Sequence, residues 1–88
     1  MRLVYVEWLD SYGCSAQWQR LSVDSCEPMI CTSVGWLLHD GPTCKVVVPH
    51  MSRGTNEGCG DMTIPNVAIV RLVDLDVPES AQSVSASN

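Results

Sequence analysis

Five side chains in this sequence are of the types that bind a flat, negatively charged ligand: Trp18, Lys45, His50, Arg53 and Arg71. An indole ring offers a flat face on which a nucleotide base stacks. Lysine and arginine attract phosphate, and histidine hydrogen-bonds to phosphate or ribose. Mostly polar residues surround Trp18, so it is the best candidate for an exposed stacking residue. The alternative is that it covers the open end of a small barrel. For the charged members, the alternative is that they are isolated surface groups, which contribute little.

Patterns that would indicate catalysis are weak. Cys59 with His50, or Ser33 with His39, would pair a nucleophile with a base, but no known nucleophile motif surrounds either pair. The glycine-rich segment 52–60 lacks a phosphate-loop motif and precedes a strand pattern instead of a helix. A chain this short also lacks the second layer that usually shields an active site from water. We therefore predict that the protein is not an enzyme.

The cysteines predict free thiols in a reducing compartment. Their number, five, is odd. Zinc is the alternative, but structural zinc sites usually show two close ligand pairs. Here the close pair is Cys26 and Cys31, and the other cysteines and histidines are scattered singly. We predict no metal and no cofactor.

Size and charge limit the partners. With 88 residues the chain forms one small domain, and its 45% hydrophobic content is typical of a folded one. The net charge of −5 argues against binding to a nucleic-acid backbone. The longest apolar runs are far shorter than a membrane span, and the first residues do not form a secretory signal. We expect neither a membrane nor a nucleic-acid partner.

The elements that must position these side chains are strands, because apolar residues recur with period two. We predict a domain over 1–76 and a disordered tail over 77–88. The predicted strands cover 2–8, 18–23, 29–39, 44–51, 61–64 and 69–75, with a loop over 52–60 and a 3₁₀ turn over 65–68.

The stretch 29–39 is the most informative of these strands. Trp36 shares one face with Val34 and Leu38, and we expect it in the core. Gly35, in the middle of the strand, predicts a bend that lets the sheet curl. A long bent strand, a tight turn at 40–42 and a return strand are typical of a small curved barrel. The predicted fold is all-β, an SH3-like or Sm-like small barrel of about five strands.

The segment Thr32-Ser33-Val34-Gly35-Trp36-Leu37-Leu38, with Val6-Glu7-Trp8-Leu9-Asp10 before it and Thr63-Ile64-Pro65 and Ile69-Val70-Arg71-Leu72 after it, resembles a group of small bacteriophage proteins of unassigned function. The resemblance covers most of residues 2–75. Its motifs are strand and turn residues, so they indicate a fold and no chemistry. The resemblance implies a protein that works in the cytoplasm of a bacterial host.

Three functions compete at this level. The first is a non-catalytic phage protein that sequesters a nucleotide immune signal of the host. The second is a structural or adaptor protein that binds a host or virion protein. The third is an Sm-like RNA binder, which the acidic charge disfavours. Because a small barrel leaves open strand edges, we also expect a homo-oligomer.

Overall fold

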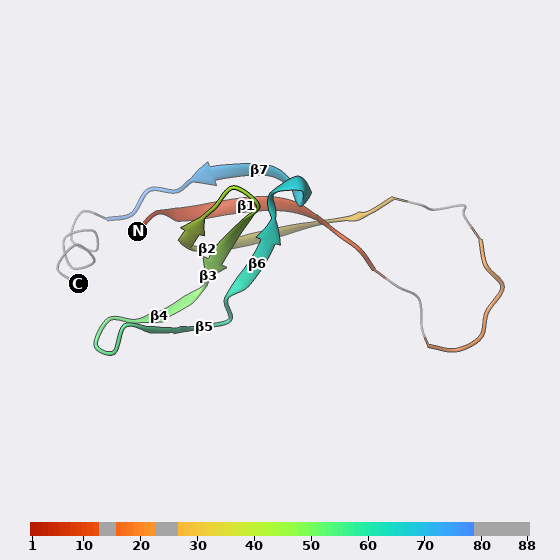
Figure 1. Cartoon of the computed structure of the whole chain (residues 1–88), viewed down its shortest axis with the longest axis horizontal. Coiled ribbons are helices and arrows are strands. Elements are labelled where there is room, and N and C mark those ends of the chain that lie inside the picture. Colours follow the sequence, from red (N-terminus) through yellow and green to blue (C-terminus); the bar gives the residue numbers. More distant parts are fainter. Residues whose placement is uncertain (13–15, 23–26, 79–88) are drawn as a thin grey trace.

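The computed structural model describes residues 1–12, 16–22 and 27–78 and confirms the all-β fold (Figure 1). A five-stranded antiparallel sheet has the order β6-β3-β2-β1-β7, and β4 and β5 form a separate two-stranded sheet. The strands are β1 (Leu3–Asp10), β2 (Met29–Asp40), β3 (Cys44–Val48), β4 (His50–Ser52), β5 (Glu57–Cys59), β6 (Met62–Pro65) and β7 (Ile69–Asp74). A 3₁₀ turn, η1 (Asn66–Ala68), precedes β7 as predicted.

The core lies on one face of the five-stranded sheet, which we call the inner face. Its buried members come from four strands and are Val4, Val6, Leu37, Val47 and Ile64, with Trp8, Ala68, Ile69 and Leu72 packed around them. The indole N–H of Trp8 donates to Ser33 Oγ at 3.0 Å, so a polar group at the core edge is satisfied. Short aliphatic side chains from neighbouring strands therefore form one small core.

The opposite face, which we call the outer face, is also rich in apolar side chains. It carries Tyr5, Ile30, Val34, Trp36, Leu38 and Val73, together with the ion pair of Glu7 and Arg71. Residues opposite each other in an antiparallel pair share a face, as Tyr5 does with Val34 on β2 and Val73 on β7. Ile30 is 64% exposed and Val34 52% exposed. Much of this apolar surface is thus in contact with solvent.

The structure corrects our assignment of Trp36 to the core. The buried residues of β2 are Gly35 and Leu37, and Trp36 is half-buried on the outer face. A Cβ on Gly35 would lie 2.7 Å from Val47 Cγ1 and 2.8 Å from the Val48 carbonyl oxygen. Glycine is therefore required here because the β3 backbone comes so close. The face of β2 that contains Gly35 and Leu37 is the one that packs in the core.

Two further predictions were wrong. Residues 18–22 of the predicted strand 18–23 do not form one, and each of them is exposed. The predicted loop over 52–60 is instead the hairpin of β4 and β5, in which the turn covers 53–56. A strand needs a partner for its backbone groups; residues 57–59 find one in β4. Most of the predicted tail, residues 79–88, lies outside the described residues.

Closure of the sheet into a barrel stays a prediction. Strands β6 and β7 stand at the two ends of the sheet order. Along the chain they are joined by η1. Asn66, the first residue of η1, donates its side-chain N–H to the Gly41 carbonyl oxygen at 2.9 Å and so links η1 to the β2–β3 turn. The described residues contain no helix long and apolar enough to cross a bilayer.

Candidate functional site

The β4–β5 hairpin forms one wall of the candidate site. Its register pairs His50 with Cys59 and Ser52 with Glu57. The backbone N–H of Asn56 donates to the Ser52 carbonyl oxygen at 3.0 Å, and Asn56 has a φ of 58°. Asparagine tolerates this left-handed conformation better than most residues, so it suits the last position of the turn. The hairpin is therefore a local structure with its own turn chemistry.

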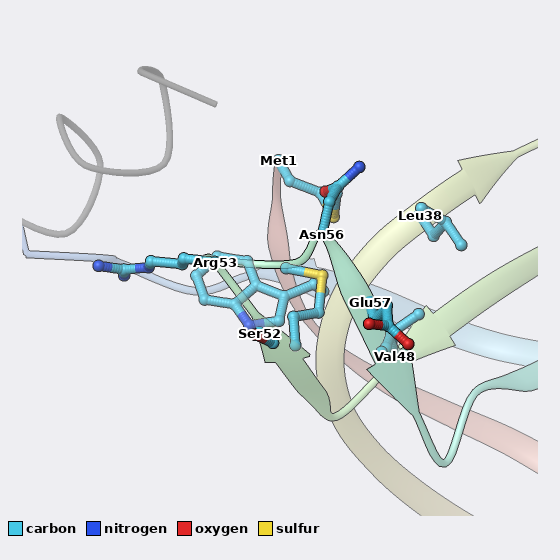
Figure 2. A pocket seen from close by; sticks show the side chains of 10 residues that line it. Met1, Leu38, Val48, Ser52, Arg53, Asn56 and Glu57 are labelled. Carbon is cyan, nitrogen blue, oxygen red and sulfur yellow. The ribbon is translucent and has the colours of Figure 1, made fainter.

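A pocket of about 400 Å³ lies between this hairpin, the end of β2 and the first residue of the chain. Figure 2 shows its lining, which is Met1, Trp36, Leu38, Val48, Met51, Ser52, Arg53, Asn56, Glu57 and Gly58. This volume falls within the range that small-molecule sites occupy. The β4–β5 hairpin thus covers one end of the outer face and encloses a site there.

The pocket has an apolar floor and a polar rim. The floor includes Trp36 and Val48, which are opposite each other on β2 and β3. The rim carries Arg53, Asn56 and Glu57. In Figure 2 the Arg53 side chain extends away from Glu57, so the two opposite charges stand apart. The arrangement offers a flat aromatic surface with a separate cation, an amide and a carboxylate around it.

Gly58 allows the hairpin to lie directly on the pocket floor. A Cβ at this position would be 2.9 Å from Val48 Cγ1 and 3.0 Å from the His50 carbonyl oxygen. Both separations are closer than normal van der Waals contact, so a side chain here would lift the hairpin from Val48. The shape of the pocket therefore depends on a glycine within β5.

The structure places the five predicted ligand residues at different sites. Arg53 lines the pocket. His50 lies on the same hairpin but borders a neighbouring shallow hollow with Cys59. Trp18 is fully exposed in the segment between β1 and β2, as the first of its two interpretations predicts. His50 and Arg53 are close in the sequence and therefore lie on the same hairpin, but they border two different hollows.

Lys45 and Arg71 are engaged in ion pairs. Lys45 Nζ contacts an Asp40 carboxylate oxygen next to the β2–β3 turn. Arg71 Nη2 lies 2.8 Å from Glu7 Oε1, and its guanidinium is 5.9 Å from the centre of the Tyr5 ring. The hydrogen bond from Lys45 is the largest cause that lowers the pKa of Asp40. These two cations therefore have protein partners on separate strands.

The thiols that the structure describes, Cys31, Cys44 and Cys59, are free. Cys14 and Cys26 lie outside the described residues, and Cys26 is one member of the close pair that the sequence contains with Cys31. Within the described ranges, no three histidine, cysteine or acidic side chains gather as metal ligands. His50 and Cys59 are cross-strand neighbours and exposed, which gives this pair no shelter from water.

Trp36 is the site residue that sequence reasoning missed. It alternates with Val34 and Leu38, a pattern that fits a core face as well as a pocket floor. The available signal was the neighbouring glycine. A face that contains Gly35 leaves room for an adjacent strand, so that face packs inward and the indole beside it faces outward.

Comparison with known proteins adds no assignment: no family model matches the chain, and neither does any curated protein or solved structure. The resemblance to small phage proteins stays a prediction from the sequence. The pocket and the exposed apolar surfaces are the features of the molecule that bear on its function.

Proposed function

We propose that this protein is a non-catalytic binding protein that holds a nucleotide-type ligand in the pocket beside the β4–β5 hairpin. The observation that carries the proposal is the half-buried indole of Trp36 on the pocket floor, with Arg53 at the rim. Stacking of a base on an aromatic side chain contributes about 1–3 kcal/mol. Arg53 supplies the positive charge for a phosphate.

The remaining polar groups fit the edges of a base or ribose. Glu57 accepts hydrogen bonds through its carboxylate, and Asn56 both donates and accepts. These are the partners that amino groups, ring nitrogens and hydroxyls require. Sequestering a nucleotide immune signal of a bacterial host, in the host cytoplasm, is the biological role we propose on the basis of the phage resemblance.

Architecture supports a small-barrel assignment of SH3-like or Sm-like type. The sheet order β6-β3-β2-β1-β7, with η1 before the last strand, is the arrangement expected for such a barrel. Binding sites on scaffolds of this kind lie on loops and hairpins that the sheet positions. The β4–β5 hairpin plays that part here.

Calorimetric titration tests this function with a panel of AMP, GMP, cyclic di-AMP, cyclic di-GMP and NAD. We expect one member to bind and to be recovered unchanged. Trp36→Leu, which keeps an apolar floor, should weaken binding about 5- to 150-fold, the equivalent of one stacked base. Arg53→Gln should weaken it as well.

Arg71→Gln is the matched control, because it removes an arginine that lies on β7, paired with Glu7 and outside the pocket lining. If Arg71→Gln reduces affinity as much as Arg53→Gln, the ligand binds elsewhere. If no panel member binds at millimolar concentration, the proposed ligand class is wrong. Conversion of a bound nucleotide to product would contradict a non-catalytic role.

A second candidate, a structural or adaptor protein, is favoured by a different observation. Apolar side chains of the outer face are exposed, while Lys45 and Arg71 are held in ion pairs. Apolar side chains that are exposed together on one face are a mark of protein-binding sites. Pull-down of one stoichiometric host or virion protein by the wild type, lost in Val34→Asp, would support this function.

A further inference from the structure

Glu57 is the acidic residue of the pocket lining, and its carboxylate has no partner in the protein. In the part of the chain that the structure describes, Glu7, Asp40 and Asp74 are held in ion pairs with lysine or arginine. Glu57 forms neither an ion pair nor a side-chain hydrogen bond there. Its place on β5 is fixed by the pairing with Ser52 on β4. The carboxylate can therefore accept hydrogen bonds from a ligand in the pocket.

The surroundings of Glu57 suit the edge of a flat ring. Trp36 and Val48 form the apolar floor, and the hairpin that carries Glu57 forms a wall. Gly58, the next residue, keeps this wall against the floor, because a Cβ there would lie 2.9 Å from Val48 Cγ1. A ring stacked on the floor presents its edge, and not its face, to the walls. The hydrogen-bonding groups along that edge then decide which ring fits beside Glu57.

The charges of the pocket distinguish the two ends of a nucleotide. Arg53 lies on the same hairpin, and its side chain extends away from Glu57 (Figure 2). A phosphate beside Glu57 would meet a like charge, whereas beside Arg53 it meets an opposite one. The phosphate therefore belongs at Arg53 and the base edge at Glu57.

A carboxylate selects among the bases because it accepts hydrogen bonds and, when ionised, donates none. The Watson–Crick edge of guanine offers N–H donors on two adjacent atoms, N1 and N2, which match the two oxygens of one carboxylate. Adenine offers its amino group beside N1, and the lone pair of N1 would face a carboxylate oxygen. Cytosine and uracil each have one donor atom on this edge, next to acceptors. Guanine is thus the complementary base.

We propose that the pocket selects guanine nucleotides, with the base stacked on Trp36 and its N1–H and N2–H groups donating to the Glu57 carboxylate. The inference rests on the proposed function, since it names the base that the nucleotide ligand carries. Stacking is similar for every base and supplies affinity, whereas Glu57 supplies the choice. Because Glu57 is exposed in the free protein, guanine replaces hydrogen bonds to water, and the penalty falls on bases that cannot replace them.

Calorimetric titration of the wild-type protein with GMP, IMP and AMP tests this selection without any substitution. The three nucleotides share ribose and phosphate. IMP lacks the 2-amino group of guanine but keeps N1–H, and AMP lacks both donors. GMP should bind about 5- to 150-fold more tightly than AMP, which is the discrimination that a bidentate contact to a base provides. IMP should bind with intermediate affinity. Cyclic di-GMP should be preferred over cyclic di-AMP for the same reason.

Glu57→Gln tests the residue itself. An amide both donates and accepts, so it no longer matches guanine and instead matches the amino group and N1 of adenine. The ratio of GMP to AMP affinity should fall at least fivefold, with unchanged circular dichroism. The loss of a negative charge affects both nucleotides alike and cancels in this ratio.

Two further variants control for the charge and for stacking. Glu27→Gln makes the same chemical change at an exposed residue outside the pocket lining, and it should leave the GMP to AMP ratio unchanged. Trp36→Leu should weaken GMP and AMP by similar factors, because both bases stack, and should also leave the ratio unchanged.

The outcomes separate this selection from the proposed function. If AMP binds as tightly as GMP and Trp36→Leu weakens both, nucleotides bind in the pocket but Glu57 does not choose among them, and the selection is wrong. A GMP preference that survives Glu57→Gln would show that another group reads the base. Absence of binding by every nucleotide, the cyclic ones included, would overturn both the selection and the proposed function.

Discussion

The two faces of the five-stranded sheet have similar compositions but different surroundings. On the inner face, Val4, Val6 and Ile64 are 0–1% exposed, while on the outer face Ile30 and Val34 are more than half exposed. Both faces are made of aliphatic and aromatic side chains with period two. What separates them is packing, because side chains from four strands meet in the core on the inner face, with Ala68 of η1 packed against them, while Ile30 and Val34 on the outer face stay exposed. Apolar character therefore indicates a buried strand without saying which face is buried.

The largest expected effect is on the inner face, and an isoleucine on each face provides the comparison. Ile64→Ala should lower the free energy of unfolding by about 2–5 kcal/mol, because it removes buried methylene groups and leaves a cavity. Ile30→Ala should change it by about 0.5 kcal/mol or less under conditions that keep the protein monomeric. Urea titration of both variants measures this. Equal losses would mean that the two faces are equally buried.

Gly35 tests how close β3 comes to β2. Gly35→Ala should destabilise the fold by about 1–3 kcal/mol, because its Cβ would contact the Val48 carbonyl oxygen, which has no rotamer to move away. Gly54→Ala is the matched control, since a Cβ there meets nothing within 4 Å. Thermal melts of the two variants measure the difference. A melting temperature unchanged by Gly35→Ala would contradict the close approach.

Trp36 and Trp18 allow the stability contributions of a half-buried and a fully exposed indole to be compared. Trp36→Ala should cost about 1–3 kcal/mol of stability, because this side chain is half-buried against Val48 and the β4–β5 hairpin. Trp18→Ala should leave the stability of the monomer unchanged, since its side chain is fully exposed. Denaturant titration of dilute protein checks both. A greater loss for Trp18→Ala would reverse the assignment of these two side chains.

The smallest effect on stability is expected at the ion pairs of Asp40, which lie beside the β2–β3 turn. Lys45, and then Arg2, lower the pKa of Asp40 below its ordinary value of 3.8. The folded state thus holds the charged carboxylate more firmly than the unfolded chain does. This contribution is present above pH 3.8 and is lost as the pH falls through the lowered value.

Acid titration of stability tests the contribution of Asp40. Asp40→Asn should reduce the fall in stability of the wild type in this acid range. Asp61→Asn, which removes an exposed acid outside the ion pairs described here, should not. Both side chains of the Asp40–Lys45 pair are partly exposed, so the difference should be small and should shrink in salt. An identical acid profile for Asp40→Asn and wild type would contradict the linkage.

Much of the strand order along the chain was predictable from local chemistry. Alternating residues at 2–8 and 29–39, the Gly41-Pro42 turn and the Pro65 entry into η1 all lie where the structure has β1, β2, the tight turn and the 3₁₀ turn. The hairpin at 50–59 was not predictable in the same way. Its glycines are typical of a loop, and its strands form because residues 57–59 pair with 50–52 above Val48.

The candidate site shows the same division. Arg53 and His50 could be chosen by residue type, but their types did not say that one would line the pocket and the other the hollow beside it. Lys45 and Arg71 looked like available cations in the sequence. In the structure both are paired. Arg71 contacts Glu7, which is distant along the chain, and Lys45 contacts Asp40, which lies across a tight turn.

By itself the sequence determined that this protein is made of strands, where most of them begin and end, and that both faces of β2 are apolar. Only the tertiary structure decided which face became the core. Period two divides a strand into two sets of side chains but does not distinguish them. The choice follows from Gly35, which lets the β3 backbone approach from one side, so that Leu37 turns inward and Trp36 turns out to form the floor of a pocket.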